Sequence, residues 1–229
     1  MKAALLCLPL LAVQAFAPAV EITAEPHHHL VFGNKIVRVF NVQVDPNTET
    51  KMHWHRHDYI SVNIGPAEIV NAVKGKPPAT VKLADGDVRF ASATFSHLVR
   101  DTADYPFRNV TVEILQDEAL RKLPPQEDAN KKEDHLLTNG TEKVLFIKDG
   151  IRATQFELQP GAAIPMHHHA GPHLQIAVTS LDLRSEVDGQ GPTLAHSNPG
   201  DSKWFPANFS HTVINIGKQP AKFITLEFP

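Results

Sequence analysis

The sequence predicts an all-β protein made of two copies of one small jelly-roll domain, and two observations support this prediction. Sliding the 229-residue sequence by 114 positions aligns residues 31–115 with residues 145–229 without a gap. Short segments alternate apolar and polar residues, as half-buried strands do, with Gly, Pro and Asp-Gly turns between them. Many short strands are typical of a sandwich or barrel, and about 85 residues per copy suits a small jelly-roll.

The identities between the two copies are dense and keep one register. KIVRVFNVQV at 35–44 and KFITLEF at 222–228 are the clearest strands, one from each copy. Chance does not keep so many identities in register, so we interpret the chain as a duplicated domain. The repeated residues with charged or metal-binding side chains are Arg38 with Arg152, His53 with His167, His55 with His169, His97 with His211, and Glu113 with Glu227.

The first 19 residues have the pattern of a secretory signal peptide. Lys2 precedes an apolar run, and small residues follow as a choice of cleavage points. The apolar run is shorter than the roughly 18–20 residues that a membrane-spanning helix needs. We therefore expect a secreted or periplasmic protein from which residues 1–19 are removed.

The repeat also predicts how the rest of the chain is divided. We expect an N-terminal barrel at 20–115, a linker at 116–139 and a C-terminal barrel at 140–229. The linker is charged and contains Pro124-Pro125, and one short helix is expected before this pair.

Composition excludes several classes of partner. The formal charge of −3 gives no basic footprint for nucleic acid, and we expect no membrane contact once the signal is removed. Cys7 is the only cysteine and lies within the predicted signal, so the mature chain would have neither a disulfide nor a thiolate metal ligand. The chain has fourteen histidines, and their side chains are the ones most able to bind a metal or take part in catalysis.

Histidines recur at strand spacing in both copies. Residues i and i+2 of a strand share a face, so His53 and His55 point the same way, as do their counterparts His167 and His169. A third histidine follows 44 residues after the first in both copies, in the sequence Phe-Ser-His. Three imidazoles from two neighbouring strands can converge on a divalent ion, and imidazole suits zinc, copper, iron and nickel, while manganese tolerates it.

These motifs resemble those of the cupin superfamily, specifically a two-domain bicupin. His-x-His and a later Gly-Asp leading to a final His both appear twice, and the resemblance covers nearly all of the chain outside the signal and linker. The resemblance implies two tandem double-stranded β-helix (jelly-roll) barrels, with one metal ion in each intact barrel. It also implies a homodimer as one form of assembly.

The chain departs from the cupin pattern at the acidic ligand. Where cupins usually have Glu, the first copy has Tyr59 and the second has His173. We expect the first site to contain His53, His55 and His97, with Tyr59 as a phenolate ligand, an acid or base, or a packing residue. The second site would add His173 to its three histidines, His167, His169 and His211. Without the carboxylate, the ion's charge favours an anionic substrate.

Two other histidine positions are interpreted as surface residues. His168 lies between two predicted ligands and should point away from the metal. The stretch PHHHL at 26–30 has no counterpart in the second copy, and we interpret it as a solvated entry strand. The paired Arg38 and Glu113 predict an internal ion pair, with an outer role at the metal as an alternative.

The function expected from these features is metal-dependent chemistry on a small molecule, with dioxygenase-type oxidation as the leading expectation. The divalent ion would be iron, manganese, copper, nickel or zinc. Two alternatives stay open, because a fold does not determine a reaction. One is a non-redox cupin isomerase or lyase, and the other is an exported protein that binds a ligand or metal without turnover.

Overall fold

The computed structural model describes residues 18–116, 137–187 and 190–229. Almost all of the predicted signal and most of the predicted linker, including Pro124-Pro125 and the expected helix, lie outside the described residues. Within them, the fold is all-β apart from one 3₁₀ turn at Ile22–Ala24. No helix in the described ranges is long and apolar enough to cross a membrane.

Two five-stranded sheets make up the N-terminal half, in the orders β1-β4-β9-β6-β7 and β2-β3-β10-β5-β8. Short runs of β-branched and aromatic residues form the strands, and glycines in turns such as Gly75 and Gly86 adopt the positive φ that glycine permits. The strands are β1 (Val20–Glu21), β2 (His28–Gly33), β3 (Val37–Val44), β4 (His53–His55), β5 (Tyr59–Asn63), β6 (Ala67–Val73), β7 (Ala79–Leu83), β8 (Val88–Ala91), β9 (Phe95–Asp101) and β10 (Phe107–Ile114).

One eight-stranded sheet makes up the C-terminal half, in the order β15-β14-β17-β12-β18-β13-β16, with β11 paired to β12. The 19-residue β12 corresponds to β3 and β4 of the first copy, and it pairs with β18 through residues 152–158 and with β17 through residues 163–169. The strands are β11 (Thr138–Lys148), β12 (Ile151–His169), β13 (His173–Ala177), β14 (Leu181–Val187), β15 (Thr193–Ser197), β16 (Ser202–Phe205), β17 (Phe209–Asn215) and β18 (Ala221–Glu227).

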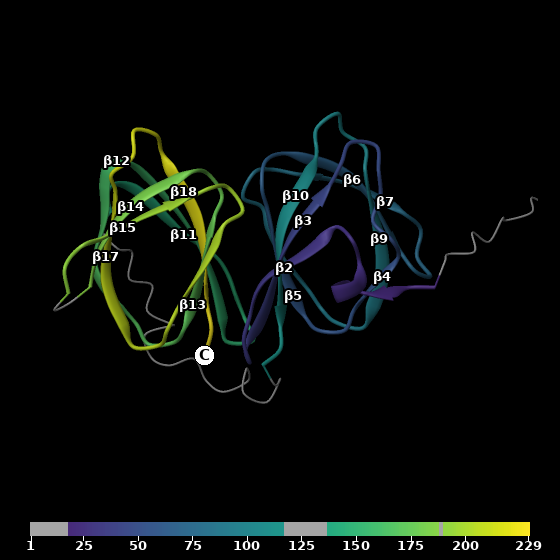
Figure 1. Cartoon of the computed structure of the whole chain (residues 1–229), viewed down its shortest axis with the longest axis horizontal. Helices are drawn as coiled ribbons and strands as arrows, with labels where there is room; N and C mark the ends of the chain where they lie inside the picture. The colour runs from purple at the N-terminus through teal and green to yellow at the C-terminus, as the bar shows by residue number, and fades with distance from the viewer. Residues whose placement is uncertain (1–17, 117–136, 188–189) are drawn as a thin grey trace, which may run out of the picture.

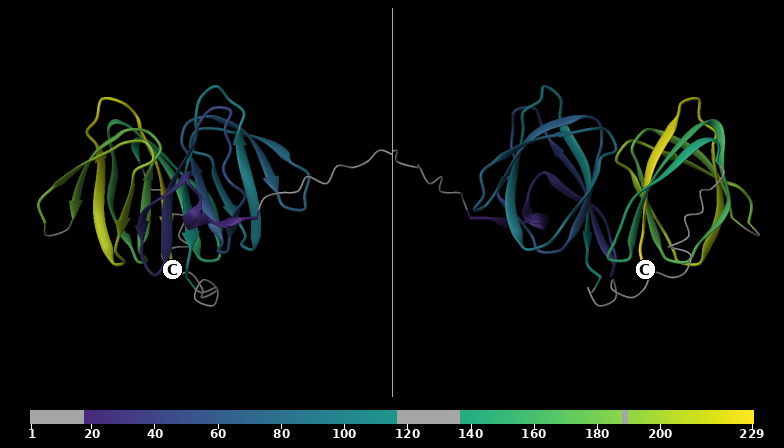
Figure 2. Two further views of the ribbon diagram at one scale, coloured as in Figure 1. Left: turned by 45° about the vertical axis from the view of Figure 1, so that its right-hand side comes forward. Right: turned by 180° about the vertical axis from the view of Figure 1, so that it is seen from behind.

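The two halves lie side by side as two barrel-shaped bodies (Figures 1 and 2). Among the described strands, every pairing stays within one half. The all-β prediction is confirmed. β11 begins at Thr138, just before the start predicted for the second barrel, and the predicted domain limits themselves stay predictions.

The largest apolar cluster lies between the barrels, because strands such as β3 bury both faces. Val37 and Val39 pack in a cluster that also contains Ile151 and Leu174 of the other half. The alternate residues of β3 face the barrel interior instead, where Phe40 belongs to a separate cluster. The same alternation places Arg38 on the barrel side of β3, and it is the barrel side of the strands that carries the candidate site.

Candidate metal centres

The first centre joins His53 and His55 on β4 to His97 on the neighbouring β9. His53 and His97 are direct partners in the antiparallel register, so their side chains share the inner face. All three are buried, and one nitrogen of each lies within 4.8 Å of the others. The Nε2 atoms of His97 and His53 are 3.1 Å apart, and those of His97 and His55 are 3.0 Å apart.

Outer partners determine which nitrogen of these rings carries the proton. His53 Nδ1 lies 2.8 Å from the Lys51 carbonyl oxygen, and His97 Nδ1 lies 2.8 Å from Asn71 Oδ1, so both Nδ1 atoms donate. Burial lowers the pKa of His53 to about 4 and holds the pKa values of His55 and His97 well below their usual range, so the rings are neutral at pH 7.

Two neutral rings that both donate through Nδ1 have only lone pairs at Nε2. The lone pairs of His53 and His97 therefore face each other across 3.1 Å, an arrangement that a hydrogen bond cannot satisfy but a cation can. Two of the three imidazoles, His53 and His97, have tautomers held by carbonyl oxygens, as metal-binding histidines usually are. These residues fit a divalent ion.

The second centre repeats this geometry with His167 and His169 on β12 and His211 on β17. Their nitrogens again lie within 4.8 Å of one another, with His211 Nε2 3.3 Å from His169 Nε2. Burial, followed by the neighbouring histidines, lowers the pKa of His211 to about 3. The outer partners at Nδ1 are the Pro165 carbonyl oxygen for His167 at 2.8 Å, Glu227 Oε1 for His169 at 2.7 Å, and Ser185 Oγ for His211 at 3.2 Å.

The residues at the usual acidic position stack on the second histidine of each motif. The Tyr59 ring lies on His55 with centroids 4.1 Å apart, and the His173 ring lies on His169 at 3.8 Å. Burial raises the pKa of Tyr59 to about 12 and lowers that of His173 to about 2, so both side chains are neutral. Neither belongs to the converging groups of three nitrogens. Metal ligation by His173 and a catalytic role for Tyr59 stay predictions.

The paired Arg and Glu residues behave differently in the two barrels. Arg38 and Glu113 form the predicted internal ion pair, with Nη2 2.7 Å from Oε2. In the second barrel, Glu227 accepts a hydrogen bond from Nδ1 of the predicted ligand His169. The predicted ion pair is therefore confirmed in the first barrel, and an outer role of Glu227 at the metal stays a prediction.

The interpretation of PHHHL as a solvated entry strand holds for Pro26, His29 and Leu30, which are exposed, but not for His28. The His28 side chain is 5% exposed, and its ring centroid lies 4.6 Å from that of His53. His28 Nδ1 lies 2.6 Å from Oε2 of the buried Glu25. Burial raises the pKa of Glu25, but hydrogen bonds from His28 and His27 outweigh it and bring the pKa to about 2. The alternation of side chains along a strand could have indicated that His28 points inward. Of three consecutive histidines, the middle one points to the opposite face from its two neighbours.

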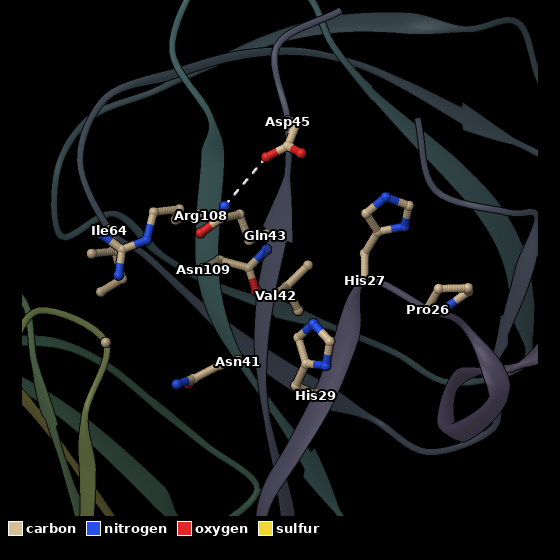
Figure 3. A pocket seen from close by; sticks show the side chains of 11 residues that line it. Pro26, His27, His29, Asn41, Val42, Gln43, Asp45, Ile64, Arg108 and Asn109 are labelled. Carbon is tan, nitrogen blue, oxygen red and sulfur yellow. Dashed lines mark hydrogen bonds between the residues drawn. The ribbon is translucent and has the colours of Figure 1, made fainter. Parts of the chain in front are cut away.

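The neighbours of His28 line a different hollow, on the outside of the barrel. Figure 3 shows His27 and His29 beside a pocket of about 420 Å³ that also contains Arg108 and Asp45. His168 also faces outward, as predicted: it is exposed and lies 2.9 Å from Ser210 Oγ.

Each half contains a cavity beside its histidine group, lined by all three histidines in the first half and by His211 in the second. The first cavity measures about 120 Å³ and contains the three histidines, Tyr59 and Arg89 in its lining. The second measures about 310 Å³ and is more apolar, with Phe205, His211 and Lys203 in its lining. Arg89 and Lys203 occupy the same position of the repeat, so each cavity has a cationic side chain at its wall.

Comparisons with known proteins agree with this fold. Residues 154–227 match the profile of a family described as "Cupin domain". A variant of oxalate decarboxylase from Bacillus subtilis superposes with a TM-score of 0.62 at 14% identity, covering 93% of this chain and 78% of that chain. AerE from Microcystis aeruginosa superposes with a TM-score of 0.59 at 14% identity, covering 88% of this chain and 97% of that one.

At these identities the solved structures show the fold alone, and no curated protein sequence matches the chain. The profile match lies in the C-terminal half, where it includes the second His-x-His motif and strands β13 to β18. Residues 154–227 thus match a cupin domain, and the fold of the chain is similar to that of the solved structures.

Proposed function

We propose that the chain is a metal-dependent bicupin that catalyses dioxygenase-type oxidation of a small anionic organic molecule. A divalent ion, one of iron, manganese, copper, nickel or zinc, would be held in each barrel. One observation carries the proposal: in both barrels the nitrogens of three imidazoles lie within 4.8 Å of one another, and no carboxylate is among them.

The donor set favours an anionic substrate. Three neutral ligands leave the charge of a divalent ion uncompensated, so an anion that reaches the ion is attracted to it. Arg89 and Lys203, at the walls of the two cavities, add positive charge where the rest of a substrate would lie. The first cavity, at about 120 Å³, limits its substrate to a small molecule.

The same donor set favours oxidation. Three protein ligands leave open positions on a five- or six-coordinate ion, where substrate and dioxygen can meet. The bound ion would supply redox and Lewis-acid chemistry. In a dioxygenase reaction both atoms of dioxygen enter the product and the substrate supplies all four electrons, so no separate reductant is required. The protein positions the substrate anion and shields the reaction from bulk water.

A second candidate is a lyase that uses the ion without net oxidation. The fold similarity to oxalate decarboxylase favours it, and one matching structure of that enzyme is described by its Mn(II) centres. Those names describe the other protein, and at 14% and 13% identity they do not transfer to this chain. The two candidates differ in one measurable quantity, since only the oxidation consumes dioxygen.

The test is to load the purified protein with each metal and measure dioxygen uptake across a panel of small carboxylates and enolisable diketones. We expect uptake with iron, copper or manganese, and its loss when His55 and His169 are both replaced by Ala. Turnover of a carboxylate without dioxygen uptake would instead establish the lyase. Metal binding without turnover on any substrate would leave the binding-protein alternative.

We also propose that the protein is exported. The supporting pattern is the basic start, the apolar run and the small residues of positions 1–19. Expression with this segment in a secreting host should give mature protein that begins near residue 20, as read by mass spectrometry. Full-length protein retained in the cytoplasm would contradict export.

A further inference from the structure

We infer that His28 is a fourth metal ligand of the first centre and that Glu25 holds it in place. The inference rests on the proposed function, which places a divalent ion in the first barrel. It adds a ligand from β2, a strand that carries no part of the repeated His-x-His motif.

Burial and position put His28 at the first centre. Its ring lies 4.6 Å from that of His53 and 6.4 Å from that of His55, measured between centroids. It lines the same cavity as the three converging histidines, whereas His27 and His29 line the outer pocket of Figure 3. The unequal distances place His28 beside His53 and across the cluster from His55.

The tautomer of His28 is the one that a ligand needs. Its Nδ1–H donates to Glu25 Oε2 over 2.6 Å, so Nε2 has a free lone pair. Glu25 is itself held firmly, because its carboxylate also accepts from the backbone N–H groups of His27 at 2.9 Å and Lys51 at 3.1 Å. Lys51 also supplies the carbonyl oxygen that orients His53, so one short segment positions both rings.

In each barrel a glutamate carboxylate accepts a hydrogen bond from Nδ1 of a histidine at the centre, but the histidines occupy different positions in the two barrels. In the second barrel Glu227 bonds Nδ1 of His169. In the first barrel the corresponding Glu113 pairs with Arg38, and Nδ1 of His55 is buried without a hydrogen-bond partner among the described residues. A carboxylate–imidazole pair raises the basicity of a ligand, and the first barrel provides this pair through Glu25 and His28.

His28 lies outside the group of nitrogens within 4.8 Å of one another, so a bond to the ion requires its ring to move toward the cluster. An ion at the shared point of the other three rings would attract the Nε2 lone pair. The resulting centre has four imidazoles inside the barrel and one buried carboxylate behind them, which offsets part of the charge of the ion.

The test measures the first centre alone, in a chain carrying His167→Ala to empty the second. Co²⁺ affinity is determined by competition with a chelator for this parent and for variants that add His28→Gln, Glu25→Gln or His29→Gln. We expect His28→Gln to weaken binding at least 10-fold and Glu25→Gln roughly 10-fold, in the range typical of metal-site partners. His29→Gln, the matched control on the opposite face, should bind as the parent does.

A second measurement needs no substitution at His28. In the His167→Ala chain labelled with ¹⁵N-histidine, Zn²⁺ should shift the Nε2 resonances of four imidazoles. Three shifted imidazoles, together with unchanged Co²⁺ affinity in a folded His28→Gln variant, would overturn this inference and leave the proposed function standing. A folded parent that binds no ion would overturn both.

Discussion

Replacing Glu227 with Gln tests how the second centre holds its metal. Glu227 Oε1 accepts from His169 Nδ1 over 2.7 Å, and its side chain is 21% exposed, so water screens this pair only in part. A hydrogen bond to a charged group contributes about 1.5–3 kcal/mol and a neutral one about 0.5–1.5 kcal/mol. Glutamine keeps the acceptor and removes the charge, so about 1–1.5 kcal/mol of ligand stabilisation is lost.

Since about 1.4 kcal/mol corresponds to a tenfold change in binding, Glu227→Gln should weaken metal binding at the second centre roughly tenfold. The assay is Co²⁺ competition with a chelator in a chain carrying His55→Ala, which leaves only the second centre. The matched control is Glu113→Gln, measured at the first centre in the His167→Ala chain. Glu113 pairs with Arg38, so its replacement should lower stability without weakening metal binding.

Equal Co²⁺ affinity for the Glu227→Gln variant and its parent would refute the outer role of Glu227. Equal weakening by Glu113→Gln would refute the difference that we draw between the barrels. In both cases far-UV circular dichroism must first show that the variant is folded, because loss of the fold also removes the metal.

Three further outcomes follow from the packing and charges. Leu174→Ala should lower the free energy of unfolding by about 3 kcal/mol in urea titration, because Leu174 is fully buried between the barrels, whereas Leu194→Ala, 72% exposed, should have little effect. The hydrogen bond to Asp182 raises the pKa of His196. The pair therefore stabilises the folded protein below pH 6.5, and this stabilisation is lost as the pH rises through the pKa of His196 in the folded state. Asp182→Asn should lower the midpoint of the His196 titration measured by NMR. Removing metal by chelation should lower the melting temperature, since an ion at 100 times its dissociation constant adds about 2.7 kcal/mol, and an unchanged melting temperature would contradict a structural contribution by the ion.

The duplicated histidine motifs made the fold and most of each centre predictable. Strand parity places His53 and His55 on one face, and the repeat supplies His97 and its counterpart from a neighbouring strand. These inferences need only local geometry and one long-range pairing, both of which leave a pattern in the sequence.

The buried position of His28 was not predicted, because metal ligands were expected only at positions that belong to the repeated motifs. The position that corresponds to it in the second copy is Glu142, so His28 is not part of the repeated pattern. Its role depends on Glu25 and on how β2 lies against β3, and these are tertiary facts that no local pattern records.

The alternation of residues in β3 also did not predict which face of the strand lies against the other barrel. The apolar Val37 and Val39 face the other barrel, and the charged Arg38 lies on the inner face with Glu113. Strands buried on both faces usually read as continuous apolar runs, but β3 contains Arg38, Asn41 and Gln43, so its sequence did not reveal the interface between the barrels.

The most direct test of the central claim is the metal content of the purified protein after reconstitution, measured by mass spectrometry for the wild type, His55→Ala and His169→Ala. Two converging imidazole groups predict two ions per chain, and each variant should lose one of them. A folded wild-type protein without stoichiometric metal would contradict the account of both barrels.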